Sequence, residues 1–202
     1  ILHHPDIRQF TTVWMDSLRG GESMLVNTNK LIRFYDGATG LKTGSTGSAG
    51  YCLSATAEKN GMELIAVVLK GKTSDERFSD AKSLLNYGFS TWSLVTVTPD
   101  EVLPPVPVTL GVRGTVQPVL TSENTLLVEK TLANGLTKEV ALAESVAAPV
   151  YAGDTLGQLT VRDAAGNTVA ELPILAGEDV GHVTFVQMLG RCLARGFCMG
   201  PQ

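Results

Sequence analysis

The sequence predicts an α+β domain over residues 1–91, a small all-β sandwich domain over residues 92–178, and an amphipathic helix over residues 179–202. Three observations predict this order. The first stretch has a hairpin signal and one helix-spaced apolar pattern, and the second has short apolar runs separated by turns. In the third, arginine and apolar residues segregate to opposite helical faces. A chain of 202 residues can form one or two domains with buried cores.

The composition excludes several classes of protein. Hydrophobic residues make up 44% and charged residues 18%, which is typical of a globular chain rather than a disordered one. The net charge is −4 and there is no basic run, so we expect no nucleic-acid partner. The sequence begins at Ile1 without an initiator methionine or a signal-type apolar segment, so we expect a piece of a longer precursor.

The cysteines and histidines do not predict a metal centre. The three cysteines lack zinc or C-x-x-C spacing, and we expect free thiols or small apolar residues. They are Cys52, Cys192 and Cys198. His3 and His4 are adjacent, but only His182 follows them, so we expect neither a metal nor another cofactor.

The first domain opens on short elements. Residues 5–10 predict a short helix with a proline near its start. Residues 13–19 predict a short strand, which Gly20 and Gly21 end.

An antiparallel hairpin follows. Residues 51–57 and 62–69 form two apolar runs, and Asn60-Gly61 between them is the strongest short hairpin signal that a sequence offers.

A helix comes next, with Ser74, Asp75 and Glu76 as its cap and acidic first turn and Gly88 near its end. Its apolar positions keep helical spacing. They are Phe78, Ala81, Leu84, Leu85 and Phe89.

Helical periodicity disappears between residues 92 and 175. Turn signals there separate short apolar runs, and this regular spacing predicts a small β-sandwich. The runs cover residues 94–97, 106–112, 125–128, 158–161 and 169–172. No catalytic residue types gather in this stretch, so we expect a structural or spacer module.

The last stretch, residues 180–199, predicts an amphipathic helix. One face is polar, with Thr184, Gln187, Arg191 and Arg195. The other is apolar, with Phe185, Val186, Leu189, Leu193 and Phe197. This pattern is typical of a helix lying in a membrane interface, and it is too short and polar to span a bilayer. A helix docked on its own domain or on a partner explains the pattern equally well.

The chemistry concentrates at Gly40-Leu41-Lys42-Thr43-Gly44-Ser45-Thr46-Gly47. The lysine supplies a cation for a carboxylate, and the hydroxyls supply hydrogen bonds that can rotate. The glycines beside a strand let another backbone approach closely. Lys42-Thr43-Gly44 is the K-T-G element found in penicillin-binding proteins and class A β-lactamases.

The chain resembles the second half of a D-alanyl-D-alanine carboxypeptidase, a low-molecular-mass penicillin-binding protein of bacterial cell-wall metabolism and a serine peptidase. The segments that carry the resemblance are Asn27-Thr28-Asn29-x-Leu31, residues 40–46, Ala49-Gly50-Tyr51-Cys52-Leu53, Ala57, Asn60-Gly61-Met62 and Leu84-Leu85-Asn86-Tyr87-Gly88-Phe89. The β-rich stretch, with residues 152–157 before a strand, resembles the C-terminal domain of many members. The terminal helix resembles the start of their membrane anchor.

The resemblance implies an acyl-serine mechanism on peptides ending in D-Ala-D-Ala, and binding of β-lactam antibiotics. Lys42 would raise the local positive potential, and it would help to hold the substrate carboxylate or tune the partners of the serine. Thr43 would hydrogen-bond that carboxylate, Gly44 would admit the substrate strand, and the Ser45 N–H would complete the oxyanion hole. Arg77 matches a position suggested to meet the terminal carboxylate, while an ion pair on the helix surface is an equal alternative.

Thr28 and Asn29 are candidates for the cleft wall, although a role within their own loop is the favoured interpretation, because Asn and Thr bond readily to nearby backbone.

Two family motifs are missing before Lys42. The nucleophilic serine and lysine of S-x-x-K, and the serine of S-x-N, are therefore expected upstream of Ile1, and this chain is expected to hold half of an active site without its catalytic residues. Ser79-Asp80-Ala81-Lys82 and Ser122-Glu123-Asn124 spell the two motifs but follow K-T-G, so we interpret both as coincidences.

Two hypotheses of different class follow. In the first, the chain is part of an active extracytoplasmic carboxypeptidase, completed by the missing N-terminal half and held at the membrane surface by its terminal helix. In the second, it is a non-catalytic wall-binding or interaction module on the same scaffold. A β-lactamase is a weaker third hypothesis, against which the β-rich second domain argues by analogy.

Overall fold

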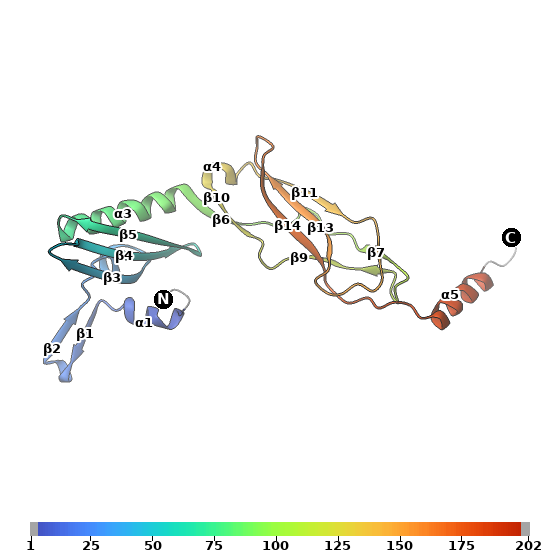
Figure 1. Ribbon diagram of the computed structural model, residues 1–202, viewed down its shortest axis with the longest axis horizontal. Helices are drawn as coiled ribbons and strands as arrows, with labels where there is room; N and C mark the ends of the chain where they lie inside the picture. Colours follow the sequence, from blue (N-terminus) through green and yellow to red (C-terminus); the bar gives the residue numbers. More distant parts are fainter. Residues whose placement is uncertain (1–3, 199–202) are drawn as a thin grey trace. The chain divides into compact units, whose positions relative to one another are not determined.

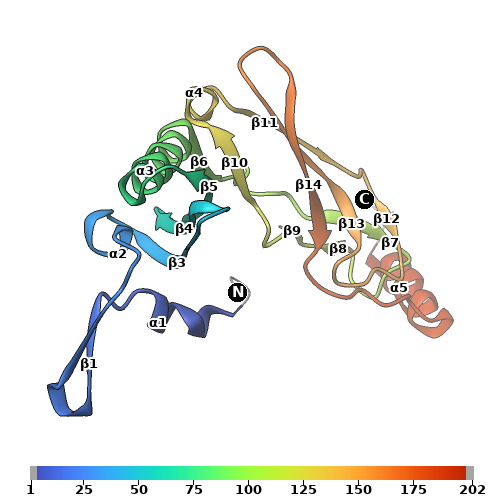
Figure 2. The same cartoon turned by 60° about the vertical axis from the view of Figure 1, so that its left-hand side comes forward.

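The computed structural model describes residues 4–198. The chain divides into two compact units, one of residues 1–94 with 127–131 and one of residues 95–126 with 132–202 (Figures 1 and 2). The first segment of the first unit ends three residues after residue 91, the domain boundary expected from the sequence, and the unit also includes residues 127–131.

The centre of the first unit is an antiparallel sheet of order β3-β4-β5. Its strands are β3 (Ala38–Thr46), β4 (Gly50–Lys59) and β5 (Met62–Gly71). The predicted hairpin is confirmed, since Lys59 pairs with Met62 across the turn. Asn60 and Gly61 have φ values of 53° and 77°. A two-residue turn of this kind requires positive φ at both positions.

Helix α3 (Ser74–Thr91) lies along one face of this sheet (Figure 1). The predicted cap was wrong by one residue, because the N-cap is Thr73, whose hydroxyl accepts from the Glu76 N–H at 3.1 Å. Gly88 lies near the end of the helix, as predicted, and α3 continues to Thr91. A Cβ at Gly88 would lie 2.5 Å from Leu64 Cδ1, so the glycine lets α3 pack closely on β5.

The core of this unit lies between α3, α2 and the sheet. Its buried residues are Leu31, Leu53, Ala55, Ala57, Ala66, Val68, Phe78, Ala81 and Leu85.

Short elements precede the sheet. They are the 3-10 helix η1 (Pro5–Ile7), α1 (Arg8–Thr11), β1 (Met15–Leu18), the 3-10 helix η2 (Arg19–Gly21), β2 (Ser23–Val26) and α2 (Leu31–Phe34). They confirm the predicted short helix and the short strand before Gly20. Strands β1 and β2 pair as a hairpin that projects from the unit (Figure 2).

Helix α1 is held to the sheet by Arg8, which donates hydrogen bonds to Glu58 of β4 at 2.6 Å and to Glu63 of β5 at 2.5 Å. The hydrogen bond to Glu58 is the main cause that raises the pKa of the Arg8 guanidinium.

Strands β6 (Trp92–Thr96) and β10 (Thr125–Glu129) form a two-stranded sheet, and the division between the units falls within both strands. Helix α4 (Lys130–Ala133) follows β10.

The second unit contains two sheets and two buried clusters. One sheet has the order β11-β13-β14-β9 and the other β12-β7-β8. The strands are β7 (Val106–Thr109), β8 (Thr115–Val116), β9 (Pro118–Leu120), β11 (Thr137–Leu142), β12 (Val146–Ala147), β13 (Thr155–Arg162) and β14 (Thr168–Ala176). The five predicted runs each contain strand residues, although β7 ends at Thr109 rather than at residue 112.

Helix α5 (Phe185–Cys198) begins later than predicted. The reason is that Val180 and Val183 are buried and their backbone groups bond to segments outside the helix. Val180 exchanges two hydrogen bonds with Val150, and the Val183 N–H donates to the Leu110 carbonyl. Thr184 and Gln187 then form a capping box.

Part of the predicted terminal helix cannot be compared with the structure. The side chains of Arg195 and Phe197, and the whole of Met199, lie outside the described residues. Among the described residues, no helix is both long and apolar enough to cross a bilayer.

Candidate functional site

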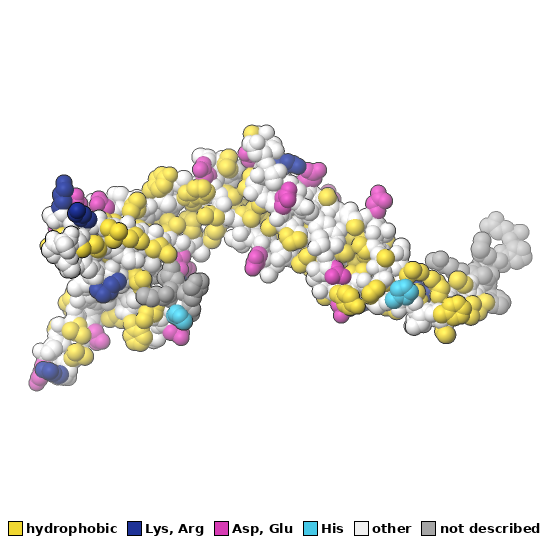
Figure 3. Space-filling view, viewed as in Figure 1, with side chains coloured by type: hydrophobic (Ala, Val, Ile, Leu, Met, Phe, Trp, Pro, Cys, Tyr) yellow, Lys and Arg dark blue, Asp and Glu magenta, His cyan; other side chains and the backbone are white. Residues whose placement is uncertain are grey.

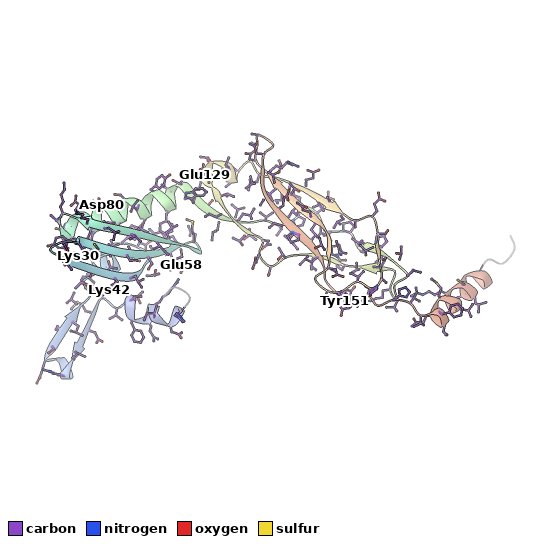
Figure 4. The ribbon with its side chains drawn as sticks, viewed as in Figure 1. Lys30, Lys42, Glu58, Asp80, Glu129 and Tyr151 are labelled. Carbon is purple, nitrogen blue, oxygen red and sulfur yellow. The ribbon has the colours of Figure 1, made fainter. Side chains whose placement is uncertain are left out.

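The K-T-G residues lie on β3, at one edge of the sheet (Figure 4). Strand β4 pairs with the inner side of β3, where Lys42 faces Ser54, Thr43 faces Leu53 and Gly44 faces Cys52. Within the described part of the chain, no strand pairs with the outer side. An edge strand presents unpaired N–H and C=O groups, to which an extended peptide can add as a further strand.

Lys42 and Thr43 project to opposite faces of β3, as neighbours on a strand do. The Lys42 ammonium bends back and donates a hydrogen bond to the Thr43 carbonyl. Thr43 is 7% exposed, and its hydroxyl lies 2.7 Å from the hydroxyl of Thr28. The strand edge therefore combines a cation with a pair of hydroxyls.

Gly44 leaves open space beside these groups. A Cβ built on Gly44 would meet no atom within 4 Å, and its φ is not in the left-handed region. Packing and backbone strain therefore do not explain the glycine. The space is free for a ligand or another backbone to approach β3 closely. The next residue, Ser45, is exposed.

Arg77 reaches β3 from the first turns of α3. Its Nη1 donates to the carbonyls of Gly44 and Cys52, at 3.3 Å each, and its guanidinium lies 4.8 Å from the Phe78 ring and 5.4 Å from the Tyr51 ring. The residue is 7% exposed, and it forms no ion pair with any carboxylate among the described residues. A buried positive charge therefore lies behind the K-T-G strand.

The loop of Asn27, Thr28 and Asn29 lies before α2 and is held by its own side chains. Asn27 Nδ2 donates to the Val13 carbonyl at 2.9 Å, and Asn27 Oδ1 accepts from the Asn29 N–H at 2.9 Å. Asn29 Oδ1 accepts from the Leu31 N–H at 3.2 Å. Asn29 thus has the loop role that the sequence favoured for it, and Asn27 has the same role. Thr28, for which a loop role was also favoured, is directed to K-T-G instead.

The two motif look-alikes lie elsewhere. Ser79 and Lys82 line a pocket of the first unit together with Lys30 and Asp75, and no K-T-G residue lines that pocket. A hydrogen bond from Lys30 lowers the pKa of the Asp75 carboxyl there. Asn124 belongs to the second unit, where its side chain donates to the Val97 carbonyl at 3.0 Å and so links the residues after β6 to those before β10.

In the described part of the chain, no group of three or more His, Cys, Asp or Glu residues lies close enough together to bind a metal ion. Cys52 and Cys192 are free thiols.

Two family models match the chain. Residues 1–73 match the model described as D-alanyl-D-alanine carboxypeptidase, and residues 95–182 match the model of the C-terminal domain of penicillin-binding protein 5. The chain belongs to the D-alanyl-D-alanine carboxypeptidase family. It corresponds to the C-terminal part of these proteins.

Curated members of the family are similar over much of the chain. D-alanyl-D-alanine carboxypeptidase DacF of Bacillus subtilis is 33% identical over 198 residues, which cover 96% of this chain and 51% of that protein. DacC of Escherichia coli is 30% identical over 143 residues, covering 70% of this chain and 36% of DacC. The chain therefore spans about half the length of DacF, and less of DacC.

Solved structures support the same fold. Penicillin-binding protein 5 from Haemophilus influenzae has a TM-score of 0.72 with 23% identity, over 90% of this chain and 53% of that chain. D-alanyl-D-alanine carboxypeptidase DacD from Francisella tularensis has a TM-score of 0.51 with 28% identity, over 79% of this chain and 40% of that chain. The mixed α/β architecture with several sheets is thus that of penicillin-binding proteins.

Proposed function

We propose that this chain supplies the K-T-G wall of a serine-type D-Ala-D-Ala carboxypeptidase, which removes the terminal D-alanine from peptidoglycan stem peptides and is acylated by β-lactams. The observation that carries the proposal is the position of Lys42-Thr43-Gly44 on an open strand edge, in a chain of this family. The same site residues on a chain of unknown family would support only peptide binding.

In the proposed mechanism, the end of the stem peptide adds to β3 as an antiparallel strand, and Gly44 leaves room for it. The Thr43 hydroxyl donates a hydrogen bond to its terminal carboxylate. The Lys42 ammonium, which bends back to the Thr43 carbonyl, adds positive potential that helps to hold the same carboxylate. The Ser45 N–H is one oxyanion-hole donor, and such a donor contributes about 3 kcal/mol to the transition state.

The nucleophilic serine and its lysine belong to the part of the relatives that this chain does not span, and that part is the obligate partner of the first unit. The serine attacks the carbonyl before the last D-alanine, D-alanine leaves, and water hydrolyses the acyl-serine ester. None of these covalent steps uses a side chain of residues 1–202.

Arg77 contributes in this proposal without touching the substrate. Its guanidinium holds the carbonyls of Gly44 and Cys52, so it supports the binding strand and adds positive potential for an anionic ligand. This role differs from the direct carboxylate contact that the resemblance implied.

In this proposal residues 1–91 are the C-terminal half of the catalytic domain, and the remaining segments position that domain. We propose that residues 92–178 form a β-sandwich spacer and that residues 179–202 lie on the outer surface of the bacterial cytoplasmic membrane. Apolar side chains gather on α5 (Figure 3), where Phe185 is 80%, Val186 77%, Leu189 49% and Leu193 55% exposed. An exposed apolar helical face of this kind fits a membrane interface.

The opposite side of α5 is attached to its own unit. Arg191 lies about 200° around the helix from Leu189, at 100° per residue. It donates to the carbonyls of Gly111 and Val112. The apolar side chains are therefore directed away from this attachment, which supports a surface anchor rather than a helix docked by its apolar face.

The test is release of D-alanine from a stem pentapeptide by the full-length protein that contains this chain. Lys42→Ala should lower kcat/KM at least 100-fold, whereas Lys72→Ala, which removes an exposed cation elsewhere in the unit, should leave it unchanged. A folded full-length protein that releases no D-alanine would favour the non-catalytic wall-binding module.

A further inference from the structure

Thr28 is a polar side chain beside K-T-G to which the proposed mechanism gives no role. Its hydroxyl oxygen lies 2.7 Å from that of Thr43, across 15 residues of sequence. Thr28 is exposed, whereas Thr43 is 7% exposed. The contact therefore links an accessible side chain of the loop before α2 to a buried one of β3.

The loop fixes the Thr28 backbone on both sides. Asn27 binds the Val13 carbonyl and the Asn29 N–H, and Asn29 caps the backbone of Leu31, which is fully buried. Because these bonds use the asparagine side chains, they do not depend on the Thr28 hydroxyl. The position of Thr28 is thus set by its neighbours, and its own hydroxyl is available for another purpose.

A bound ligand determines which of the two threonine hydroxyls donates in the hydrogen bond between them. Each threonine hydroxyl has one hydrogen to donate, and an ionised carboxylate can only accept. If Thr43 donates to the terminal carboxylate of a substrate, it has no hydrogen left for Thr28, so Thr28 must donate to Thr43. Lys42 does not compete for this position, because its ammonium donates to the Thr43 carbonyl rather than to the hydroxyl.

We propose that Thr28 is a positioning residue that selects substrates with a free terminal carboxylate. Its hydroxyl donates to Thr43 Oγ1 and so directs the single Thr43 hydrogen to the carboxylate. Two hydroxyls in series polarise each other, which strengthens the bond to the anion. This inference rests on the proposed carboxypeptidase function, in which Thr43 binds that carboxylate.

The test uses the full-length protein with two substrates, a stem peptide ending in a carboxylate and the same peptide ending in an amide. Thr28→Val keeps the side-chain volume and removes the hydroxyl. We expect it to lower kcat/KM for the carboxylate peptide about tenfold, the effect of losing one hydrogen bond to a charged ligand. The amide peptide should change less than twofold, and Thr28→Ser should restore the carboxylate peptide to within about threefold of wild type.

The outcomes separate this inference from the proposed function. Equal losses on both peptides, or no loss on either, would overturn the role of Thr28 while the carboxypeptidase activity stands. Failure of both Thr28→Val and Thr28→Ala to fold, with Thr28→Ser folded, would make the contact structural and also overturn it. A wild-type protein inactive on both peptides would overturn the proposed function, and the Thr28 inference with it.

Discussion

Gly44→Ala should separate ligand binding from folding. A Cβ at this position meets no atom within 4 Å, and the Arg77 bond to residue 44 uses the backbone carbonyl, which alanine retains. The free energy of unfolding should therefore change by less than about 0.5 kcal/mol. Any change should be a small gain, because alanine restricts the unfolded chain more than glycine does.

Binding should respond very differently. In the proposed site, a peptide or β-lactam lies along β3, at the strand separation of about 4.8 Å, and occupies the space left by the missing side chain. A methyl group there displaces the ligand by about 1 Å. A misplacement of that size can cost about 100-fold in rate. This corresponds to about 2.7 kcal/mol of activation free energy.

The assay is the second-order rate of acylation of the full-length protein by a fluorescent penicillin, paired with thermal unfolding of the same samples. Gly47→Ala is the matched control, since a Cβ there also meets nothing within 4 Å. Acylation of Gly44→Ala at the wild-type rate would refute the approach of the ligand over Gly44. A loss of more than about 1 kcal/mol in stability would refute the claim that the space is empty in the free protein.

Three further predictions concern the second unit. In Gly157→Ala the new Cβ would overlap a backbone carbonyl oxygen of β11, so calorimetry should show that the free energy of unfolding falls by about 1–3 kcal/mol. Gly114→Ala is the control and should leave the free energy of unfolding unchanged, because a Cβ there meets open space. The Asn167 side chain is the main cause that lowers the pKa of the Asp163 carboxyl in the folded state. The stability this gives is present above pH 3.8 and lost as pH falls through the folded-state pKa, so melts of Asp163→Asn and wild type should converge in acid and differ at pH 6. Leu189→Asp should weaken co-sedimentation with phospholipid vesicles at least tenfold without shifting the melt, and unchanged sedimentation would contradict membrane contact through α5.

Local signals in the sequence predicted the central hairpin and most of the strands. Asn60-Gly61 forms its turn through the φ preferences of two residues, so no tertiary information was needed. The short apolar runs of the second unit are likewise separated by turn signals that are local in the sequence. Helix α3 was predicted from its apolar face, because that face packs on one sheet.

The errors arose where a distant partner decides the structure. Gly88 lies near the end of α3, as predicted, but the reason for the glycine is its close packing on Leu64 of β5 rather than helix termination. Val180 fits the periodicity of α5, yet backbone bonds to Val150 hold it outside the helix. Neither contact can be read from neighbouring residues.

The candidate site shows the same limit. The K-T-G residues were identified from their types and spacing, but their position on an open edge follows from the sheet order. The contact between Thr28 and Thr43 spans 15 residues and has no local signature, although both residues lie in segments that carried the family resemblance. For Arg77, burial behind β3 replaces the surface ion pair that its helix position suggested.

The most direct test of the central claim is to label three proteins with a fluorescent penicillin and map the adduct by mass spectrometry. The three are residues 1–202 alone, the full-length protein, and the full-length protein with Lys42→Ala. We predict an adduct in the full-length protein only, on a serine outside residues 1–202, formed at least tenfold more slowly when Lys42 is replaced. An adduct on Ser79 of this chain, or a full-length protein that acylates equally fast without Lys42, would contradict the claim that the K-T-G strand is a wall of the active site.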